Sequence, residues 1–544
     1  MYEGGAGTQP PPTVPEPGQA MKLNWRVWPV TFAFMLSWCG WQSCFTLLSP
    51  ILTHVNADIG PHPNYSWMVA SISVCIAVVW PIAGSLSDIF GRRYFFLAGL
   101  SCGIIGSIVA CTAQSVPVVI AGTTIIGLGT AIQQMVIAAI SEIFPNKYRG
   151  YAQASITLAS TPMSGLGPLI SPLIVQSRSW RWVFYITIII DFAAFILLAI
   201  FYHPPVPNRD RSRRSLLGQI DFAGLGLFAV GLTAFLVGIS WAGGQYSWSS
   251  AAVLVPLIGG ASILVACGCW EVYGAVNPIF PPHLFREYRG FTNVLLICFV
   301  ASMPLLALLS FWPTQIASMY PASPRQIGIW TIPLTCGTLC GGILVGTIKW
   351  WRPTNYYMVG CTGVLTIFAG LLSTIDIDDV RPALAYSFLY GVGVGLLELA
   401  VIVTIQFSIG PESIGKVTGL LSSSRGVAGA CGIAIYASIL ETRLAEDLPT
   451  RVAAAAIPLG LPSSSLPALL EAAFAGNYDT AGQIPGVTPT ILDATFLSRR
   501  ESFQYSLRPI HYLGTALGGL AVILAYFTND ISPKMDDQVA VDLK

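Results

Sequence analysis

Long uncharged stretches recur along almost the whole chain and are separated by short polar or Gly/Pro-rich breaks. A helix that crosses a hydrocarbon layer of about 30 Å needs about 20 apolar residues. The uncharged stretch 222–270 is long enough for two crossings and breaks at 243–247, which predicts a hairpin of two helices. In all, the pattern predicts fourteen membrane-spanning helices, at about 28–50, 67–87, 94–113, 117–140, 152–175, 183–202, 222–242, 251–270, 291–312, 328–348, 354–374, 382–406, 415–440 and 509–528.

Composition excludes an ordinary soluble protein. Hydrophobic residues make up 54% of the 544 residues, and charged residues make up only 10%. Soluble domains carry about 25% charged residues, so this chain has too few charges to cover a water-exposed surface. The same figures argue against a disordered chain, a coiled coil or a nucleic-acid-binding protein. We therefore expect an all-α polytopic membrane protein whose surroundings are a lipid bilayer.

Lysine and arginine gather in alternate loops. With the N-terminus placed inside, seventeen of them lie in the tails and inner loops, and four lie in the short outer loops. Because basic residues are enriched in cytoplasmic loops, this bias predicts that both termini are cytoplasmic. The first 24 residues are rich in Pro and Gly and lack an apolar stretch, so they predict a disordered tail rather than a signal peptide.

A weak internal repeat suggests two halves. Gly167 follows Gly150 by seventeen residues near the start of one span, and Gly432 follows Gly415 by the same distance in another. Such repeats are typical of carriers that alternate access around a central cavity, although glycine is also common in membrane helices generally. The segment after the thirteenth span is expected to be a long outer loop with one short helix near Ser465, which ends at Gly476. The expected divisions are a tail at 1–24, a six-helix bundle at 25–203, a basic linker at 204–221, two inserted helices wedged between the halves at 222–270, a linker at 271–290, a second six-helix bundle at 291–528 with the outer loop at 441–507, and a cytoplasmic tail at 529–544.

The most specific local pattern is Gly-Ser-Leu-Ser-Asp-Ile-Phe-Gly-Arg-Arg at 84–93, between the second and third spans. Its first glycine permits close packing, its aspartate can pair with a neighbouring helix end, and its second glycine permits a tight turn. We interpret this loop, with charges of the next inner loop, as a conformational latch whose ion pairs break when the halves move. The simpler alternative is that the arginines only anchor the loop. The candidate latch residues are Gly84, Asp88, Gly91, Arg92, Arg93, Glu142 and Arg149.

Three charged residues lie well inside predicted spans, away from their ends. Such charges cost about 2.5–3.5 kcal/mol each on insertion scales, so they are retained where they pair or line a wet cavity. We expect Glu398 and Arg425 to be partners in the second bundle, so that protonating Glu398 would weaken the pair and couple a proton to movement. A static salt bridge is the alternative. Asp191 is a third candidate for proton coupling, although the sixth span of such carriers often faces lipid or packing partners.

Polar and aromatic residues at membrane depth are candidates for contacting an amphipathic small molecule by hydrogen bonds and stacking. These candidates are Trp38, Gln42, Gln133, Gln134, Gln315, Tyr390 and Gln406. The sequon Asn64-Tyr65-Ser66, on the outer side, makes Asn64 a candidate for glycosylation. We expect no enzyme activity, cofactor or metal, because the chain has no P-loop or HExxH motif and its cysteine pairs have no histidine nearby.

Several motifs together resemble the major facilitator superfamily. Residues 84–93 match its signature loop, residues 141–150 look like its loop after the fourth span, and Gly165, Gly167 and Pro168 resemble the Gly-Pro motif that antiporters use in helix packing. With Trp180-Arg-Trp182 and the text around 202–205 and 241–244, they most resemble the fungal trichothecene efflux pump family. The resemblance implies the major facilitator fold and export of a mycotoxin, secondary metabolite or drug in exchange for protons. The plasma membrane fits export best, and we expect a monomer.

The chain departs from the drug–proton antiporter pattern at three places. Gly122 occupies the position of the arginine that is usual in span four. The acidic residue often found in span one is absent from 47–50, and Ser171 and Pro172 replace the paired glycines that usually follow the Gly-Pro motif. Proton coupling therefore cannot be transferred from those positions. A siderophore-iron importer of the same fold is the main alternative, and a non-transporting membrane sensor is a more distant one. The pump-like motifs favour export.

Overall fold

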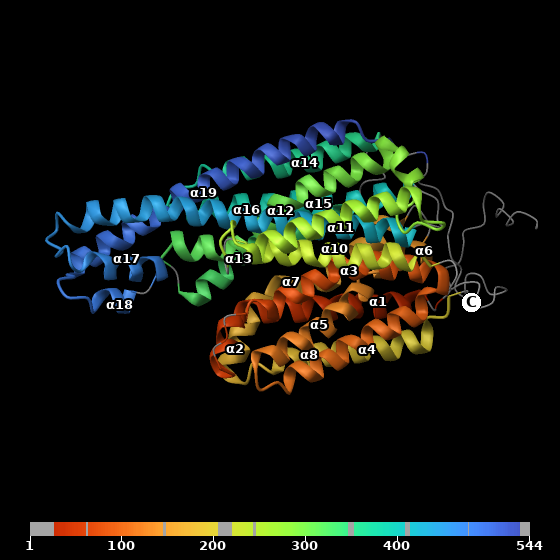
Figure 1. The fold of residues 1–544 in the computed structure, drawn as a ribbon, viewed down its shortest axis with the longest axis horizontal. Coiled ribbons are helices and arrows are strands. Elements are labelled where there is room, and N and C mark those ends of the chain that lie inside the picture. The colour runs from red at the N-terminus through yellow and green to blue at the C-terminus, as the bar shows by residue number, and fades with distance from the viewer. Residues whose placement is uncertain are drawn as a thin grey trace, which may run out of the picture.

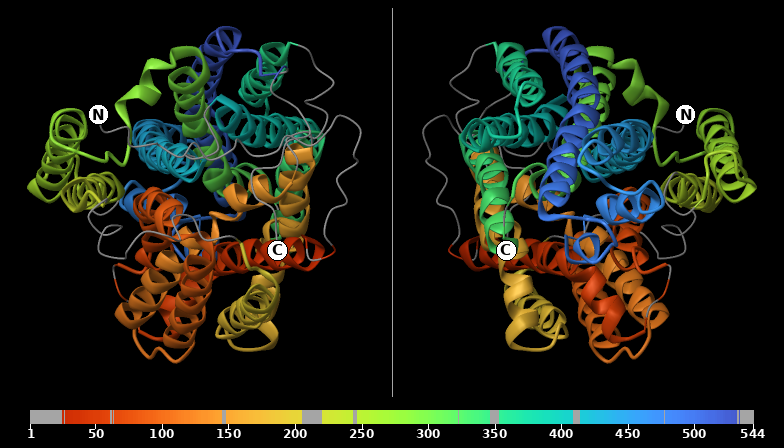
Figure 2. Two further views of the ribbon diagram at one scale, coloured as in Figure 1. Left: turned by 90° about the vertical axis from the view of Figure 1, so that its right-hand side faces the viewer. Right: turned by 90° about the vertical axis from the view of Figure 1, so that its left-hand side faces the viewer.

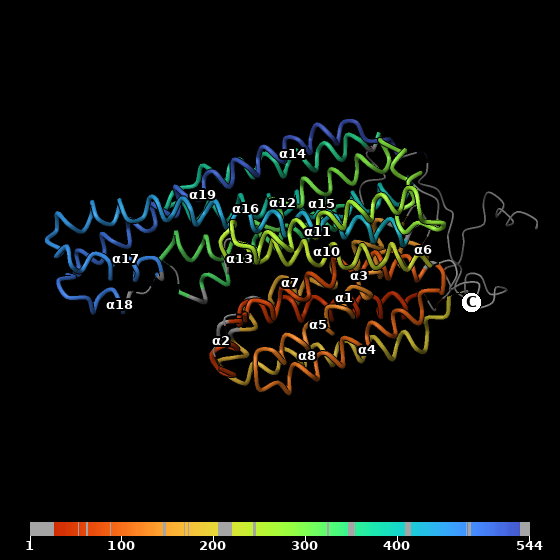
Figure 3. The backbone as a smooth tube through the Cα atoms, in the orientation of Figure 1, coloured from red at the N-terminus to blue at the C-terminus, as the bar shows by residue number. Residues whose placement is uncertain are grey.

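In a computed structural model of the chain, the structure describes residues 25, 27–60, 62, 64–144, 148–204, 220–242, 246–321, 323–345, 353–408, 414–476, 478–531 and 533. Within these residues the fold is all-α and contains no strand (Figure 1). The backbone path shows that the first and last described helices begin and end on the same side of the molecule, at the right of Figure 3. We call this side, with Val27 and Tyr526, the terminal end, and the opposite side the distal end. The first expected tail, at 1–24, lies outside the described residues, as do 205–219 of the expected linker at 204–221 and 534–544 of the expected tail at 529–544.

The first group of helices packs through small residues. α4 lies against α5 and α8, and α1 lies against α7 and α8. A Cβ atom placed on Gly106 of α4 would lie 2.7 Å from the carbonyl oxygen of Gly122 on α5, so glycine allows the two backbones to touch. The helices are α1 (Val27–Leu48), α2 (Leu52–Asp58), α3 (Trp67–Phe90), α4 (Arg92–Cys111), α5 (Val116–Gln133), α6 (Val136–Ile143), α7 (Arg149–Ser177) and α8 (Trp182–Phe201).

The second group is built in the same way. α13 lies along α15, where a Cβ atom on Gly391 would lie 2.9 Å from the amide nitrogen of Thr338. The hydroxyl of Ser323 accepts from the backbone of Gln326 and so caps the first turn of α13. The helices are α12 (Asn293–Met319), α13 (Pro324–Leu344), α14 (Thr354–Leu372), α15 (Val380–Ser408), α16 (Ile414–Ala456) and α19 (Pro489–Tyr526).

The inserted segment forms the expected hairpin of α10 (Phe222–Trp241) and α11 (Ala251–Tyr273). It lies on the outside of the molecule along the seam between the two groups, against α3 and α16, rather than in the interior between them (Figure 2). Phe228 and Leu232 of α10 pack with Ala77 and Val78 of α3, and Val427 of α16 packs against the same cluster. The hairpin therefore touches both halves of the carrier at one place.

Each of the fourteen expected spans coincides with a helix. In the described part of the chain, twelve helices are long and apolar enough to cross a membrane, and the bent helix α7 would make thirteen. Helix α1 takes the place of the first expected span. Two spans are not straight: α7 bends by 50° at residue 168, and the fourth span is interrupted by a turn at Gln134 and Met135, between α5 and α6.

The expected outer loop at 441–507 is wrong in part, because most of it is helix. α16 has 43 residues and α19 has 38, so at 1.5 Å per residue α16 is about 65 Å long, twice the depth of a hydrocarbon layer. The segment is rich in Ala, Leu, Glu and Arg, which favour helix in water as well as in lipid. The short helix α17 (Leu466–Ala475), with Gly476 at a φ of 69°, confirms the expected one, and α18 (Tyr478–Gly482) follows it. We call residues 441–456, 466–482 and 489–507 the distal extension.

The distal extension is fastened to the membrane helices by polar contacts. The guanidinium of Arg500 donates to the carbonyl oxygens of Met319, at 2.6 Å, and Ile377, at 2.7 Å. Arg508 pairs with Asp376 at 3.3 Å. Burial raises the pKa of the nearby Tyr320 hydroxyl, which therefore stays protonated. These contacts hold the extension as a fixed part of the second half.

Candidate functional site

The loop between α3 and α4 forms a tight turn with an ion pair beside it. Gly91 has a φ of 88°, which favours glycine. The buried guanidinium of Arg92 pairs with the Oε1 atom of Glu142 on α6 at 2.5 Å, and Arg93 donates to the carbonyl oxygen of Ala199 on α8 at 2.8 Å. The turn is thereby tied to two other helices of the first half. The side chains of Asp88 and Arg149, which we also expected in the latch, lie outside the part of the chain that the structure describes.

The two halves touch closely along α3 and α16 near the terminal end. A Cβ atom on Gly84 would lie 2.6 Å from the carbonyl oxygen of Gly415, so only glycine allows this approach. Two turns further along α3, the hydroxyl of Ser423 donates to the carbonyl oxygen of Ala77 at 2.8 Å. Gly84 therefore lies at the contact between the halves, and the terminal end is closed in this conformation.

A buried hydrogen-bond network also joins the halves. The Gln153 amide on α7 donates to the Oε1 atom of Gln406 on α15 at 3.2 Å, and to the Ser141 hydroxyl on α6 at 2.8 Å. The Gln406 amide donates in turn to the hydroxyl of Thr418 on α16 at 3.2 Å. All four side chains are buried. Of this network the sequence predicts only Gln406, as a cavity residue. The position of Gln153 in the repeated segment after Gly150 is the one sequence signal for the other members.

Glu398 of α15 and Arg425 of α16 form the expected ion pair through Oε1 and an η nitrogen. Both side chains are partly exposed, at 26% and 28%, although their spans lie at membrane depth and the neighbouring Leu397 is buried. Charged groups retained at this depth pair with each other or line a wet cavity, and these two side chains pair with each other.

Asp191 of α8 points into the first half and is only 1% exposed, so the orientation toward lipid that is common for this span does not apply. Its Oδ2 atom accepts from the Gln133 amide of α5 at 3.3 Å. Neither its Oδ1 atom nor the Oε1 atom of Gln133 has a hydrogen-bond partner among the described residues. A carboxyl group thus lies in the interior of the bundle with a neutral partner.

The expected cavity residues divide into two groups. Trp38 and Gln42 on α1 are half-buried, and the Trp38 ring meets that of Trp41 edge-on at 5.6 Å. The remaining five side chains are buried in this conformation, so they face a ligand only if the halves rearrange. These are Gln133, Gln134, Gln315, Tyr390 and Gln406.

The two glycines of the expected packing motif differ in how closely another helix approaches them. A Cβ atom on Gly167 would lie 2.9 Å from the hydroxyl of Thr46, so this glycine lets α7 approach α1. The nearest atom to a Cβ on Gly165 belongs to its own helix, at 3.8 Å. The side chain of Pro168 lies outside the described part. Asn64, the glycosylation candidate, is exposed at the distal end, just before α3.

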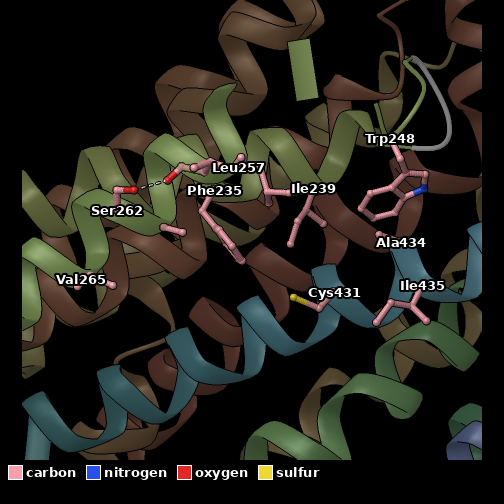
Figure 4. A pocket seen from close by; sticks show the side chains of 11 residues that line it. Phe235, Ile239, Trp248, Leu257, Ser262, Val265, Cys431, Ala434 and Ile435 are labelled. Carbon is pink, nitrogen blue, oxygen red and sulfur yellow. Dashed lines mark hydrogen bonds between the residues drawn. The ribbon is translucent and has the colours of Figure 1, made fainter. Parts of the chain in front are cut away.

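A separate groove of about 560 Å³ lies between the α10–α11 hairpin and α16 (Figure 4). Its lining is apolar and includes Phe235, Trp248 and Leu257 from the hairpin and Ala434 from α16. Ala434 follows Arg425 by nine residues, so at 3.6 residues per turn the two lie on opposite faces of α16. The groove therefore does not communicate with the Glu398–Arg425 pair through that face.

Comparison with known proteins decides the family. The family model described as "Fungal trichothecene efflux pump (TRI12)" matches residues 25–544, almost the whole chain. The chain belongs to this family. One relative is the trichothecene efflux pump TRI12 of Fusarium sporotrichioides, 28% identical over 90% of this chain and 83% of its own length. Another is the MFS-type transporter ucsD of an Acremonium species, 26% identical over 90% and 81%.

Solved structures agree on the fold of this family member. The proton:xylose symporter XylE aligns with a TM-score of 0.56 at 13% identity, over 94% of this chain and 99% of its own. The human organic anion transporter MFSD10 aligns with a TM-score of 0.52 at 18% identity, over 76% and 93%. The chain is therefore a membrane efflux transporter with the major facilitator fold, and not an enzyme. In the described residues no cluster of His, Cys, Asp and Glu could hold a metal ion.

Proposed function

We propose that this efflux transporter exports a bulky amphipathic compound, such as a mycotoxin or another secondary metabolite, in exchange for protons. The family membership and a relative whose name includes trichothecene efflux support the class of substrate. The half-buried aromatic Trp38 and the polar Gln42 on α1 suit a ligand that needs both stacking and hydrogen bonds. The observation that carries the proton part is the partly exposed ion pair of Glu398 and Arg425 at membrane depth.

The pair can convert a proton into movement by a simple change of charge. Protonation neutralises Glu398 and leaves Arg425 without its partner, so the arrangement of α15 and α16 that suits the ion pair loses its stabilisation. Leaving one charge of a buried pair uncompensated costs about 3–5 kcal/mol, and partial exposure reduces that cost. The energy is still large enough to shift the balance between two conformations of comparable stability. Proton binding and opening of the carrier are thus coupled through the Glu398 carboxyl group.

Alternating access requires the terminal end to open. The contacts that must then separate are the α3–α16 approach at Gly84 and Gly415, and the hydrogen bond from the Gln153 side chain to the Gln406 side chain. The ion pair of Arg92 and Glu142 lies within the first half and keeps the α3–α4 turn in place beside this contact. We assign the latch role to this whole region.

We propose that the terminal end faces the cytoplasm and that the carrier works as a monomer in the plasma membrane. The excess of Lys and Arg in the loops at that end supports the orientation. The distal extension and the candidate glycosylation site Asn64 then face the outside. Export across the plasma membrane fits a protein that removes a toxic product from its cell.

Transport into inside-out vesicles tests the proposal. Purified membranes with an acidic lumen are given a radiolabelled trichothecene, and accumulation is compared with and without the pH gradient. The wild type is expected to accumulate the label faster with the gradient, and Glu398→Gln is expected to lose that acceleration. Glu441→Gln, which removes an exposed carboxylate of α16, is the control. Equal accumulation with and without the pH gradient would refute proton exchange. Loss of ferric-siderophore uptake by a host from which this protein has been deleted would favour import instead.

A further inference from the structure

The Asp191 carboxyl is closely surrounded by helices of the first half. It is in the middle of the first half, where α1, α4, α5 and α8 meet. A Cβ atom on Gly40 of α1 or Gly103 of α4 would collide with its oxygen atoms, so both helices leave space for the carboxyl by carrying glycine there. A Cβ atom on Gly103 would also lie 3.0 Å from the amide nitrogen of Gln133. The site is therefore built from four helices rather than left by chance packing.

No positive charge compensates this carboxyl among the described residues. From α5 it meets the amide of Gln133, and from α4 it meets only Gly103. From α1 the one titratable group close enough to influence it is the Cys44 thiol, which is buried. One turn nearer the distal end of α8, Thr187 shares a hydrogen bond of 3.0 Å with Ser43 of α1. The surroundings are thus neutral on every side.

A proton is the group that this arrangement lacks. In the structure the Gln133 amide donates to Oδ2, and the two oxygen atoms left over, Oδ1 of Asp191 and Oε1 of Gln133, are both acceptors without a donor. An ionised carboxylate buried without a counter-ion is strongly disfavoured. A proton on Oδ1 makes it a donor, and the carboxyl and amide can then exchange two hydrogen bonds. Both unpaired oxygen atoms are satisfied by that single change.

We propose that Asp191, with Gln133 as its neutral partner, is a proton-binding site in the first half of the carrier. This inference rests on the proposed exchange of protons for substrate and names a second site of that exchange. The proton is bound in the conformation closed at the terminal end and is released when the carboxyl is exposed to water. The step is a simple association, in which carboxylate and proton form a neutral carboxyl group and no electrons move.

The interruption of the fourth span gives the site a route to the contact between the halves. Gln133 is the last residue of α5, and the turn at Gln134 and Met135 leads directly into α6. α6 carries Ser141, which bonds Gln153 of the network between the halves, and Glu142, which pairs with Arg92. A change in the hydrogen bonds of Gln133 therefore acts at the hinge between α5 and α6, where a shift of α6 disturbs both contacts. Discontinuous membrane helices form ion-coupling sites in other carriers.

Infrared difference spectroscopy of the purified wild-type protein tests the bound proton without any substrate. We expect a C=O band of a neutral, buried carboxyl group at neutral pH that disappears in Asp191→Asn and shifts in Gln133→Leu. Asp493→Asn, which removes an exposed carboxylate of the distal extension, should leave the band unchanged. Absence of the band from the wild type, or its survival in Asp191→Asn, would overturn the proposal. Because asparagine is close in shape to a neutral carboxyl, the variant is expected to fold, and size-exclusion chromatography checks this.

Transport separates this inference from the proposed function. In inside-out vesicles, Asp191→Asn is expected to keep the exchange of labelled for unlabelled trichothecene and to lose acceleration by the pH gradient. If the wild type itself ignores the pH gradient, the proposed exchange fails. If the wild type responds and Asp191→Asn responds equally, the exchange stands and the Asp191 site is refuted. Acceleration by a sodium gradient that Asp191→Asn abolishes would show that the site binds sodium instead.

Discussion

The side-chain amide of Gln153 donates to the side-chain oxygen of Gln406 over 3.2 Å, across the boundary between the two halves. Both residues are buried, and each also bonds a hydroxyl of its own half, Ser141 and Thr418 respectively. A buried hydrogen bond between neutral groups contributes about 1 kcal/mol, and an unmatched partner costs more. This contact can therefore hold the terminal end closed and still be broken in every transport cycle.

Replacing Gln153 with leucine should loosen the terminal end. The variant leaves Gln406 with one fewer partner, so the closed conformation should lose about 1 kcal/mol, which corresponds to roughly a fivefold shift in population. The rate at which a maleimide labels a cysteine introduced at the terminal end measures the shift. Ser422→Ala is the control, because within the described residues this hydroxyl donates to the carbonyl oxygen of Thr418 in its own helix. Unchanged labelling in Gln153→Leu would show that the bond does not hold the end closed.

Gly84→Ala should prevent the closed conformation from forming. The added Cβ atom would lie 2.6 Å from the carbonyl oxygen of Gly415, too close for any contact without moving α3 away from α16. Net transport should fall at least tenfold while the protein still reaches the membrane. Gly360→Ala is matched to it, because a Cβ atom there meets nothing within 4 Å. Equal transport by the two variants would contradict a close contact at Gly84.

Arg92→Ala should destabilise the protein more than it affects substrate binding. Its guanidinium is buried and paired with Glu142, and breaking a buried pair leaves a charge uncompensated at a cost of about 3–5 kcal/mol. Thermal unfolding in detergent, followed by fluorescence-detected chromatography, should show a clear fall in the midpoint. Arg451→Ala provides the comparison, since its side chain is more exposed than that of Arg92 and its pairs lie nearer the surface, where ion pairs contribute about 0–1 kcal/mol. A similar midpoint for both variants would mean that the Arg92 pair contributes little.

Arg500→Ala should free the distal extension from the membrane helices. Its two hydrogen bonds to the carbonyl oxygens of Met319 and Ile377 would be lost, and residues 489–507 should exchange their amide hydrogens faster. Hydrogen exchange followed by mass spectrometry measures the effect segment by segment. Arg443→Ala removes an exposed guanidinium of α16 and should change little. Exchange at 489–507 that matches the wild type would locate the attachment elsewhere.

The membrane helices could be predicted because lipid imposes one requirement, about 20 apolar residues, that the sequence displays directly. The same rule does not predict where a helix ends outside the bilayer. Charged residues after position 440 end the apolar stretch, but the helix α16 continues through them to Ala456. The ion pair of Glu398 and Arg425 could also be predicted from the sequence, since isolated charges at membrane depth are costly. The contact of Gln153 with Gln406 could not, because it depends on how the two halves meet.

Asp191 shows a different limit. Its place nine residues into a span was clear from the sequence, but whether it faced lipid or the bundle depended on the rotation of α8 against three other helices. The sequence shows glycine at positions 40 and 103, but it does not show that both lie against one carboxyl group, which depends on the packing. The side chain for which a glycine makes room therefore cannot be predicted until the packing of the helices is known.

Because α16 is one continuous helix of 43 residues, it works as a lever. About 55 Å separate Gly415, at its contact with α3, from Val452 in the distal extension, at 1.5 Å per residue. A rotation of about 5° around the Gly415 end would swing the remote tip through about 5 Å. A fluorophore placed on the distal extension would therefore report motion at the contact of α16 with α3. Its displacement would be larger than that of any label near Gly415.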